Sequence, residues 1–188
     1  AGVERADSLI VDPHKWLFAP FDCAALLYRD PAKGRASHTQ KAGYLETLNQ
    51  AADAGDWNPS DYQVGLSRRA RGVPLWFALA THGTDAFASA ISQSLQLAAE
   101  VAEVIDATPH LDLVERPDLS VVACRVAGWD QDGYQRWSDA LLASGLGLVV
   151  ASQHDFGDGP EPIMRLCFLN PRTTLDHVTE ILDTIPAP

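Results

Sequence analysis

The sequence has little cysteine, a single methionine and no excess of positive charge. Three cysteines, Cys23, Cys124 and Cys167, are spread over 188 residues. They lack the C-x-x-C spacing of zinc sites, so we expect neither a disulfide framework nor a metal centre. We interpret all three as buried small hydrophobic residues of a reducing, cytoplasmic protein.

The charge balance and the hydropathy exclude two classes of partner. Lysine and arginine number 14 against 25 aspartates and glutamates, which gives a formal net charge of −11. Nucleic acid requires a basic face, so we expect no nucleic-acid partner. No apolar run is long enough to span a bilayer, and the first residues have no apolar core of a signal peptide, so we expect no membrane partner.

The most informative stretch of the chain is residues 8–17. The short apolar run Leu9 to Val11 stops at Asp12-Pro13, which predicts a buried strand that leads into a loop. Lys15 follows at once. An arbitrary lysine is most often a solvated surface residue. A lysine held at the end of a buried strand could instead be desolvated, lose its proton and attack carbonyl groups.

The spacing around this lysine resembles that of a known enzyme family. The pattern consists of Ser8, Leu9, Lys15, Trp16, Leu17, Phe21, Asp22, Cys23, Leu26 and Arg29. It resembles the pyridoxal-phosphate attachment motif of the group II amino-acid decarboxylases, which include the aromatic amino-acid, histidine and glutamate decarboxylases. The resemblance continues through residues 61–69 and 75–77 and ends weakly near residues 164–168.

This resemblance implies a fold and partners. The fold class is α/β: the C-terminal part of the large, cofactor-binding domain of a fold type I pyridoxal-phosphate enzyme over residues 1–92, with a catalytic loop at about 33–58, and a small α+β domain over residues 93–188. Such enzymes carry a further N-terminal half. We therefore expect that half to come from the same enzyme or from a separate chain, and the complete enzyme to be a homodimer.

The resemblance also assigns residues around the cofactor. It makes Lys15 the lysine that holds pyridoxal phosphate as a Schiff base. Asp12 takes a position near the cofactor phosphate that is often asparagine in the family; the alternative is a turn residue before Pro13. His14 is expected to help hold the phosphate end, and a structural histidine is the alternative. Ser67 is expected to approach the cofactor phosphate of the neighbouring subunit.

Two further residues are expected to contact the substrate. Tyr44 fits the tyrosine of a mobile loop that reaches the substrate carbon; packing against one side of the loop is the alternative. Arg165 interrupts an apolar strand and should face a partner or a cleft. The resemblance makes it a holder of the substrate carboxylate, and a structural salt bridge is the alternative. The arginines Arg68, Arg69 and Arg71 could clamp a phosphate or carboxylate, or form a solvated helix start with partner contacts.

The remaining chain predicts helices and short strands. Residues 73–107 have helical spacing, with a break expected at Gly83. An antiparallel sheet covered on one face is expected from strands at 111–115, 121–126, 148–152 and 163–169. Helices are expected at 130–144, ending at Gly145, and at 174–185, capped by Thr174 or Thr173. The histidines at 110, 154 and 177 are expected to be solvated.

The resulting functional hypothesis is pyridoxal-phosphate-dependent decarboxylation of an L-amino acid to an amine and carbon dioxide. Lys15 and Tyr44 are the expected catalytic residues, and an aromatic substrate is favoured weakly. One alternative is another pyridoxal-phosphate-dependent reaction at the α-carbon of the amino acid, such as formation of the aldehyde that corresponds to the amine. The other is an inactive fragment or a dimerising scaffold.

Overall fold

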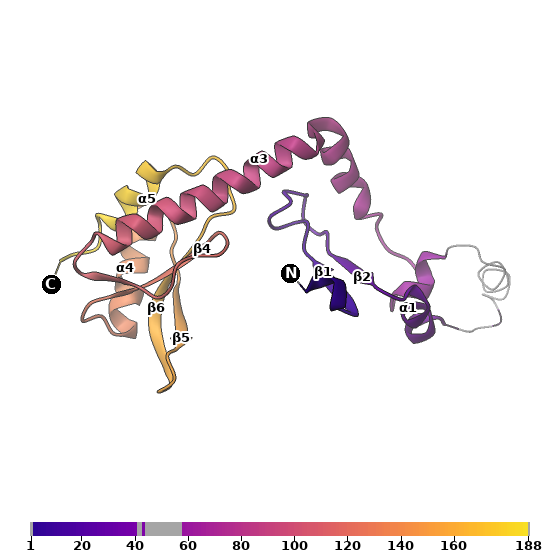
Figure 1. Ribbon diagram of the computed structural model, residues 1–188, viewed down its shortest axis with the longest axis horizontal. Helices are drawn as coiled ribbons and strands as arrows, with labels where there is room; N and C mark the ends of the chain where they lie inside the picture. The colour runs from indigo at the N-terminus through magenta and orange to yellow at the C-terminus, as the bar shows by residue number, and fades with distance from the viewer. Residues whose placement is uncertain (1, 41–42, 44–57, 188) are drawn as a thin grey trace. The chain divides into compact units, whose positions relative to one another are not determined.

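The computed structural model describes residues 2–40, 43 and 58–187. The chain divides into two compact units, a first unit of residues 1–83 and a second unit of residues 84–188. Their helices and strands are labelled in Figure 1. The domain boundary expected at residue 92 concerns the complete enzyme and stays a prediction.

The first unit is built on one antiparallel strand pair. β1 (Ser8–Val11) pairs with β2 (Ala25–Tyr28), and Ser8 lies opposite Tyr28. The other elements are the short 3-10 helices η1 (Val3–Arg5) and η3 (Pro59–Tyr62) and the helix α1 (Pro31–His38). The pairing register closes the loop of residues 12–24 at the end of β1, which is where Lys15 lies.

The two strands exist where the sequence predicts them, but the prediction that they are buried is wrong. Ile10 is 72% exposed and Leu27 is 51% exposed. Runs that are apolar on both faces are typical of strands covered on both sides. A two-stranded sheet offers no such cover by itself, so these side chains face solvent in this chain.

A helix occupies the start of the segment that was expected to be a loop from residue 33. α1 begins at Pro31, and the carboxylate of Asp30 accepts a hydrogen bond from the backbone N–H of Ala32 at 3.1 Å. An Asp-Pro pair suits a turn and a helix start equally well, which is why the pattern misled. Gly34 allows α1 to pack closely, because a Cβ there would lie 2.9 Å from the Tyr28 ring.

The long helix α3 (Gly72–Asp106) contains the expected break at Gly83. The backbone at Gly83 has φ 75° and ψ 159°, a combination that only glycine adopts readily. A Cβ at this position would meet no atom within 4 Å, so the dihedral angles and not the available space require glycine. The prediction of a broken helix is confirmed.

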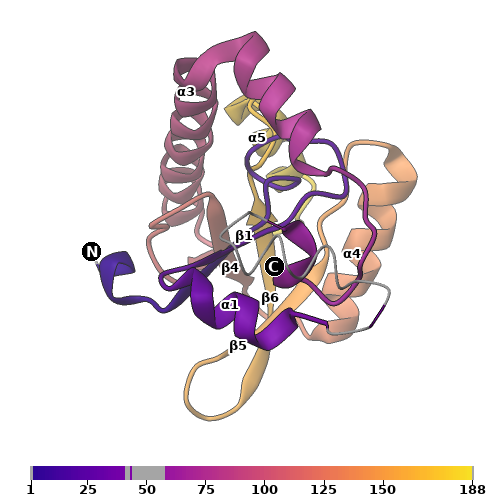
Figure 2. The same ribbon diagram turned by 90° about the vertical axis from the view of Figure 1, so that its right-hand side faces the viewer.

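The second unit contains a four-stranded antiparallel sheet, as predicted. The strands are β3 (Leu111–Leu113), β4 (Val121–Val126), β5 (Ala151–Asp155) and β6 (Pro160–Cys167), in the spatial order β3-β4-β6-β5. β5 and β6 run side by side as a hairpin in both Figure 1 and Figure 2. The helices α4 (Gln131–Ser144) and α5 (Leu175–Leu182) complete the unit.

The two strands of the hairpin reach about three residues further into their connecting loop than predicted: β5 begins and ends three residues later, and β6 begins three residues earlier. Ala151 pairs with Met164 and Asp155 with Pro160, so β5 consists largely of polar residues. The apolar Leu148 and Val150, which were expected in the strand, lie outside it and are each 61% exposed. Backbone pairing does not depend on side-chain polarity, and the turn between the strands sets the register.

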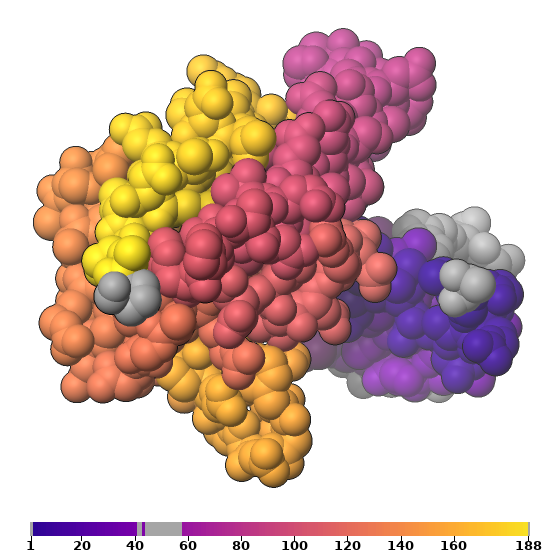
Figure 3. Space-filling view, turned by 60° about the vertical axis from the view of Figure 1, so that its left-hand side comes forward, coloured from indigo at the N-terminus to yellow at the C-terminus, as the bar shows by residue number. Residues whose placement is uncertain are grey.

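One face of this sheet packs into the core of the unit. Val122, Cys124 and Val126 alternate along β4 and are at most 4% exposed. They join Ile105 of α3 and Val178 of α5 in one buried cluster. Figure 3 shows the surface of α3 beside the C-terminal residues drawn in yellow. Covering by helices on one face is therefore confirmed.

The helix ends follow their sequence signals. Asp130 caps α4 by accepting a hydrogen bond from the N–H of Gly133 at 2.8 Å, and Gly145 ends the helix with φ 78°. Thr174 caps α5 and forms a reciprocal pair of hydrogen bonds with His177. The Gly145 end matches the prediction, and Thr174 is the cap among the two candidates, but α5 ends at Leu182 and not at the predicted residue 185.

Cysteine and histidine burial matches the predictions in part. Cys23 and Cys124 are buried, but Cys167 is exposed because it lies on the uncovered side of β6. His110 was expected to be solvated; instead it is half-buried and its Nε2 atom is shielded, with no hydrogen-bond partner among the described residues. His154 and His177 are exposed, as expected.

Candidate active site

Lys15 lies on a tight turn immediately after β1. The turn is closed by a hydrogen bond of 2.9 Å from the backbone N–H of Lys15 to the carbonyl oxygen of Asp12. The same two residues form an ion pair, with 2.6 Å between Lys15 Nζ and Asp12 Oδ2. The end of the strand therefore presents an amine and a carboxylate together.

The electrostatics of this pair differ from the expected desolvated lysine. The Lys15 side chain is 62% exposed, so in this chain it is not removed from water. The hydrogen bond from Lys15 is the main cause that lowers the pKa of Asp12 below its ordinary value, and the positive charge of Lys15 acts in the same direction. Asp12 is thus a carboxylate that faces a cation.

His14 ties the two ends of the loop together. Its backbone N–H donates to the carbonyl of Cys23 at 3.2 Å. Its ring nitrogen Nδ1 accepts from the N–H of Cys23 at 3.2 Å and lies 2.5 Å from the Cys23 carbonyl oxygen. The ring also contacts Phe21 edge-on, with 5.2 Å between ring centroids. These contacts fit the structural alternative for His14, and the phosphate role stays a prediction.

Two ion pairs brace the first unit, and sequence analysis had found neither. Arg71 Nε lies 3.0 Å from Asp22 Oδ2, and this contact is the main cause that lowers the pKa of Asp22. Arg35 Nε lies 3.1 Å from Asp61, whose side chain is 4% exposed. Partners that are 26 or more residues apart leave no spacing signal, so only the fold reveals them.

The other predicted site residues are placed as follows. Ser67 is exposed in the segment between η3 and α3. Tyr44 lies outside the described residues. Arg165 belongs to the second unit, and no ion pair joins it to any residue that the structure describes, so the salt-bridge alternative gains no support.

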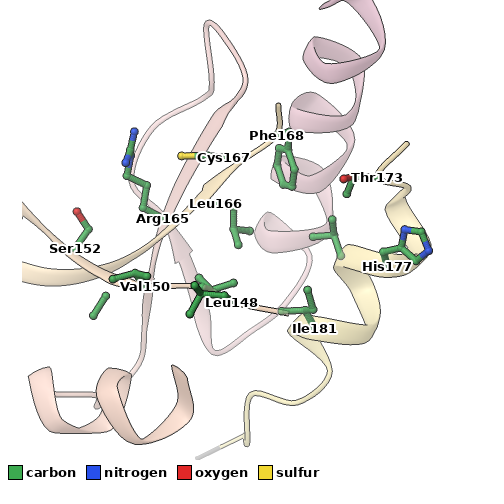
Figure 4. A pocket seen from close by; sticks show the side chains of 13 residues that line it. Leu148, Val150, Ser152, Arg165, Leu166, Cys167, Phe168, Thr173, His177 and Ile181 are labelled. Atoms are coloured by element: carbon green, nitrogen blue, oxygen red, sulfur yellow. The ribbon is translucent and has the colours of Figure 1, made fainter. Parts of the chain in front are cut away.

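Arg165 lines a cavity of about 480 Å³ in the second unit. Figure 4 shows the cavity beside α5, where the chain before β5 separates from β6. Its walls are mostly apolar and include Leu148, Val150, Phe168 and Ile181, while Cys167 and His177 add polar groups. Arg165 thus lies in the wall of this cavity, and its role in holding a substrate carboxylate stays a prediction.

The fold is that of a pyridoxal-phosphate decarboxylase. The crystal structure of Oryza sativa TDC with PLP and tryptamine superposes with a TM-score of 0.81 at 24% sequence identity. The match covers 98% of this chain and 39% of that chain. The predicted fold class is confirmed.

Sequence comparison identifies the family. Residues 1–127 match the pyridoxal-dependent decarboxylase conserved domain, and the chain belongs to this family. The aromatic-L-amino-acid decarboxylase of Bacillus atrophaeus is 28% identical over 191 residues, which are 99% of this chain and 39% of that protein. The L-2,4-diaminobutyrate decarboxylase of Rhizobium meliloti is 31% identical over 98% of this chain and 37% of its own length.

The relatives also include an enzyme that is named as an aldehyde synthase and not as a decarboxylase. The 3,4-dihydroxyphenylacetaldehyde synthase of Aedes aegypti is 32% identical over 155 residues, 80% of this chain and 29% of that protein. In each of these comparisons the chain spans less than two fifths of the relative's length. The chain therefore corresponds to one part of each of these relatives.

The described residues suit the cofactor that this family uses. Pyridoxal phosphate is an aldehyde that attaches to a lysine amine, and Lys15 offers an accessible primary amine on an ordered turn.

No helix in the described part of the chain is long and apolar enough to cross a membrane. Nor do its described histidines, cysteines and carboxylates form a group of three or more suited to a metal ion.

Proposed function

We propose that the protein containing this chain is a pyridoxal-phosphate-dependent decarboxylase that converts an L-amino acid to an amine and carbon dioxide. The observation that carries the proposal is Lys15, presented with Asp12 on the turn after β1 within residues that match the pyridoxal-dependent decarboxylase domain. The Bacillus atrophaeus and Rhizobium meliloti relatives, which match nearly the whole chain, are both named as decarboxylases.

In this proposal each residue has a distinct task. Pyridoxal phosphate, when bound, supplies a conjugated ring that accepts the electron pair left on the α-carbon as carbon dioxide departs. Lys15 binds the cofactor through Nζ and releases the product. Asp12, His14 and Ser67 are assigned to the cofactor end. Arg165 holds the substrate carboxylate, for which its planar guanidinium is suited.

Tyr44 is assigned to proton transfer. After carbon dioxide leaves, the α-carbon requires a proton, and a tyrosine hydroxyl can donate one at that point. A loop that closes over the substrate would also exclude water. Replacement of Tyr44 by Phe should then slow amine formation or shift the product towards the aldehyde.

The proposal includes partners for the first unit. Leu9, Ile10, Leu26 and Leu27 are all more than 40% exposed on two paired strands. Two strands alone are marginally stable in water, and apolar surface on both faces calls for further strands and helices. We assign that cover to the remainder of the enzyme, on the same chain or a separate one, and propose a homodimer of the complete enzyme.

Three free cysteines support a reducing, cytoplasmic compartment.

The decisive test is borohydride reduction of the complete enzyme with pyridoxal phosphate, followed by mass spectrometry under denaturing conditions. Reduction makes the attachment permanent, so one adduct should map to Lys15. Lys15→Ala should lose the adduct and the activity, whereas Lys33→Ala should keep both, because Lys33 is an exposed lysine on α1. An adduct-free wild-type protein would refute the assignment and favour an inactive fragment or scaffold.

Product analysis separates decarboxylation from the second candidate function. Conversion of the amino acid to an aldehyde is favoured by one observation, the likeness to the Aedes aegypti synthase. An amine as the main product supports decarboxylation, and an aldehyde as the main product supports the alternative. We favour an aromatic substrate, and the test is to compare aromatic amino acids with L-2,4-diaminobutyrate as competing substrates.

A further inference from the structure

Asp12 and Lys15 form a local pair whose geometry is set by the turn itself. They are three positions apart in the sequence, and the backbone hydrogen bond from Lys15 to Asp12 closes the turn at 2.9 Å. This brings Lys15 Nζ to 2.6 Å from Asp12 Oδ2. The Asp12 side chain is 30% exposed, so the contact is open to solvent on one side and available to an incoming ligand.

Two other polar side chains of the loop have partners elsewhere. The ring of His14 is held by the backbone of Cys23, and the carboxylate of Asp22 is held by Arg71. Within the described part of the chain, Asp12 is the carboxylate that pairs with Lys15. The hydrogen bond and charge of Lys15 also lower the pKa of Asp12, so Asp12 stays ionised at neutral pH.

Attachment of an aldehyde requires Lys15 to leave this ion pair. The ammonium releases one proton to solvent, and the nitrogen then forms a bond to the carbonyl carbon. The carbonyl oxygen departs as water with the two protons that the nitrogen still carries. The ion pair with Asp12 must break before the nitrogen can attack, so the neighbouring carboxylate opposes attachment.

We propose that Asp12 is a positioning residue that competes with the cofactor for Lys15 and so limits the rate at which the enzyme takes up pyridoxal phosphate. The proposal rests on the proposed function of Lys15 as the attachment site. It gives Asp12 a role before the reaction begins: the carboxylate holds the lysine in a defined place until the aldehyde displaces it from the ion pair.

The first experiment measures Lys15 reactivity in the cofactor-free enzyme, using acetic anhydride and quantitative mass spectrometry. The ratio of acetylation at Lys15 to that at Lys33 should rise about two- to fivefold in Asp12→Asn, as expected for loss of one exposed ion pair. Asp12→Glu keeps the carboxylate and should restore a low ratio. Asp7→Asn removes one charge just before β1 and should leave the ratio unchanged. An unchanged ratio in Asp12→Asn overturns the ion pair.

The second experiment follows uptake of pyridoxal phosphate by the complete enzyme through its absorbance. Asp12→Asn should load about two- to fivefold faster than wild type, with Asp7→Asn equal to wild type. In wild type, high salt should speed loading, because salt screens exposed pairs. Equal or slower loading in Asp12→Asn overturns the proposal even if a Lys15 adduct forms. Absence of any adduct in wild type refutes the proposed function instead, while the acetylation ratio still tests the pair.

Discussion

Apolar strands of similar sequence are buried in the second unit of the chain and exposed in the first. In the second unit, Val122 and Cys124 on β4 are fully buried against helices. In the first unit, Ile10 on β1 is 72% exposed and Leu26 on β2 is 48% exposed. Both kinds of strand are rich in residues that favour sheets. The difference lies in what surrounds each strand.

This contrast separates strand formation from strand burial. Four strands and three helices of the second unit share one core, so its apolar residues find neighbours within 105 residues. β1 and β2 have only each other as sheet partners in the described chain. An apolar run thus indicates that a strand can be covered on both faces. In the first unit, the exposed run is the surface that the proposed remainder of the enzyme would cover.

The sharpest test replaces one isoleucine in each unit. Ile105 is fully buried, and Ile105→Ala should lower the free energy of unfolding by about 2–5 kcal/mol. Ile10→Ala should change it by less than about 0.5 kcal/mol in this chain, because the side chain is already in water. Urea unfolding followed by circular dichroism measures both. In the complete enzyme the cost of Ile10→Ala should rise into the range for buried residues; a cost that stays small there would contradict the assigned cover.

A second test compares a tyrosine hydroxyl in each unit. Tyr134 is 2% exposed, and its hydroxyl oxygen accepts a hydrogen bond of 2.8 Å from the N–H of Val126. Tyr134→Phe leaves that buried N–H without a partner and should cost about 1–3 kcal/mol. The half-buried Tyr28 hydroxyl lies 3.3 Å from His38 Nε2, and Tyr28→Phe should cost less, since water can replace the contact. Thermal unfolding of both variants decides; equal costs would argue against the contrast.

The smallest expected effect concerns the ion pair of Asp22 in the first unit. Arg71 lowers the pKa of Asp22, so the pair stabilises the fold above the ordinary aspartate pKa of 3.8 and is lost as pH falls through the lower, folded-state pKa. Titration of the Asp22 carboxyl by NMR should give a midpoint below 3.8. Arg71→Gln should move the midpoint up towards that value, and Arg69→Gln should move it less, because Arg69 contributes only a weaker charge effect.

Much of the fold could be predicted because it depends on neighbours in sequence. The caps Asp130 and Thr174, the break at Gly83 and the bounds of β4 follow from local signals, and all agree with the structure. The position of β5 could not be predicted, because its register depends on pairing with β6. The exposure of Lys15 could not be predicted either, because the burial of a side chain depends on which other segments pack against it and not on its neighbours in sequence.

The candidate site was predictable in a different way. Lys15 stands out through a pattern of about ten positions, which lies within the residues 1–127 that match the family, and its role as the attachment site stays a prediction. The contacts that set its surroundings, from Asp12 to Lys15 and from Arg71 to Asp22, required the turn and the loop to be built. The roles of Tyr44, Ser67 and Arg165 stay predictions, and the experiments above address the first step of the chemistry.

The uncovered strand pair has a consequence for how the protein assembles. β1 and β2 present free backbone edges together with apolar side chains, which is the combination that recruits strands from other molecules. While they are uncovered, docking of their own neighbours competes with clumping of identical copies, and the second process grows with concentration. A high concentration of the chain during synthesis would therefore favour aggregates, and early docking of the strands that we propose as cover would protect the yield of folded protein.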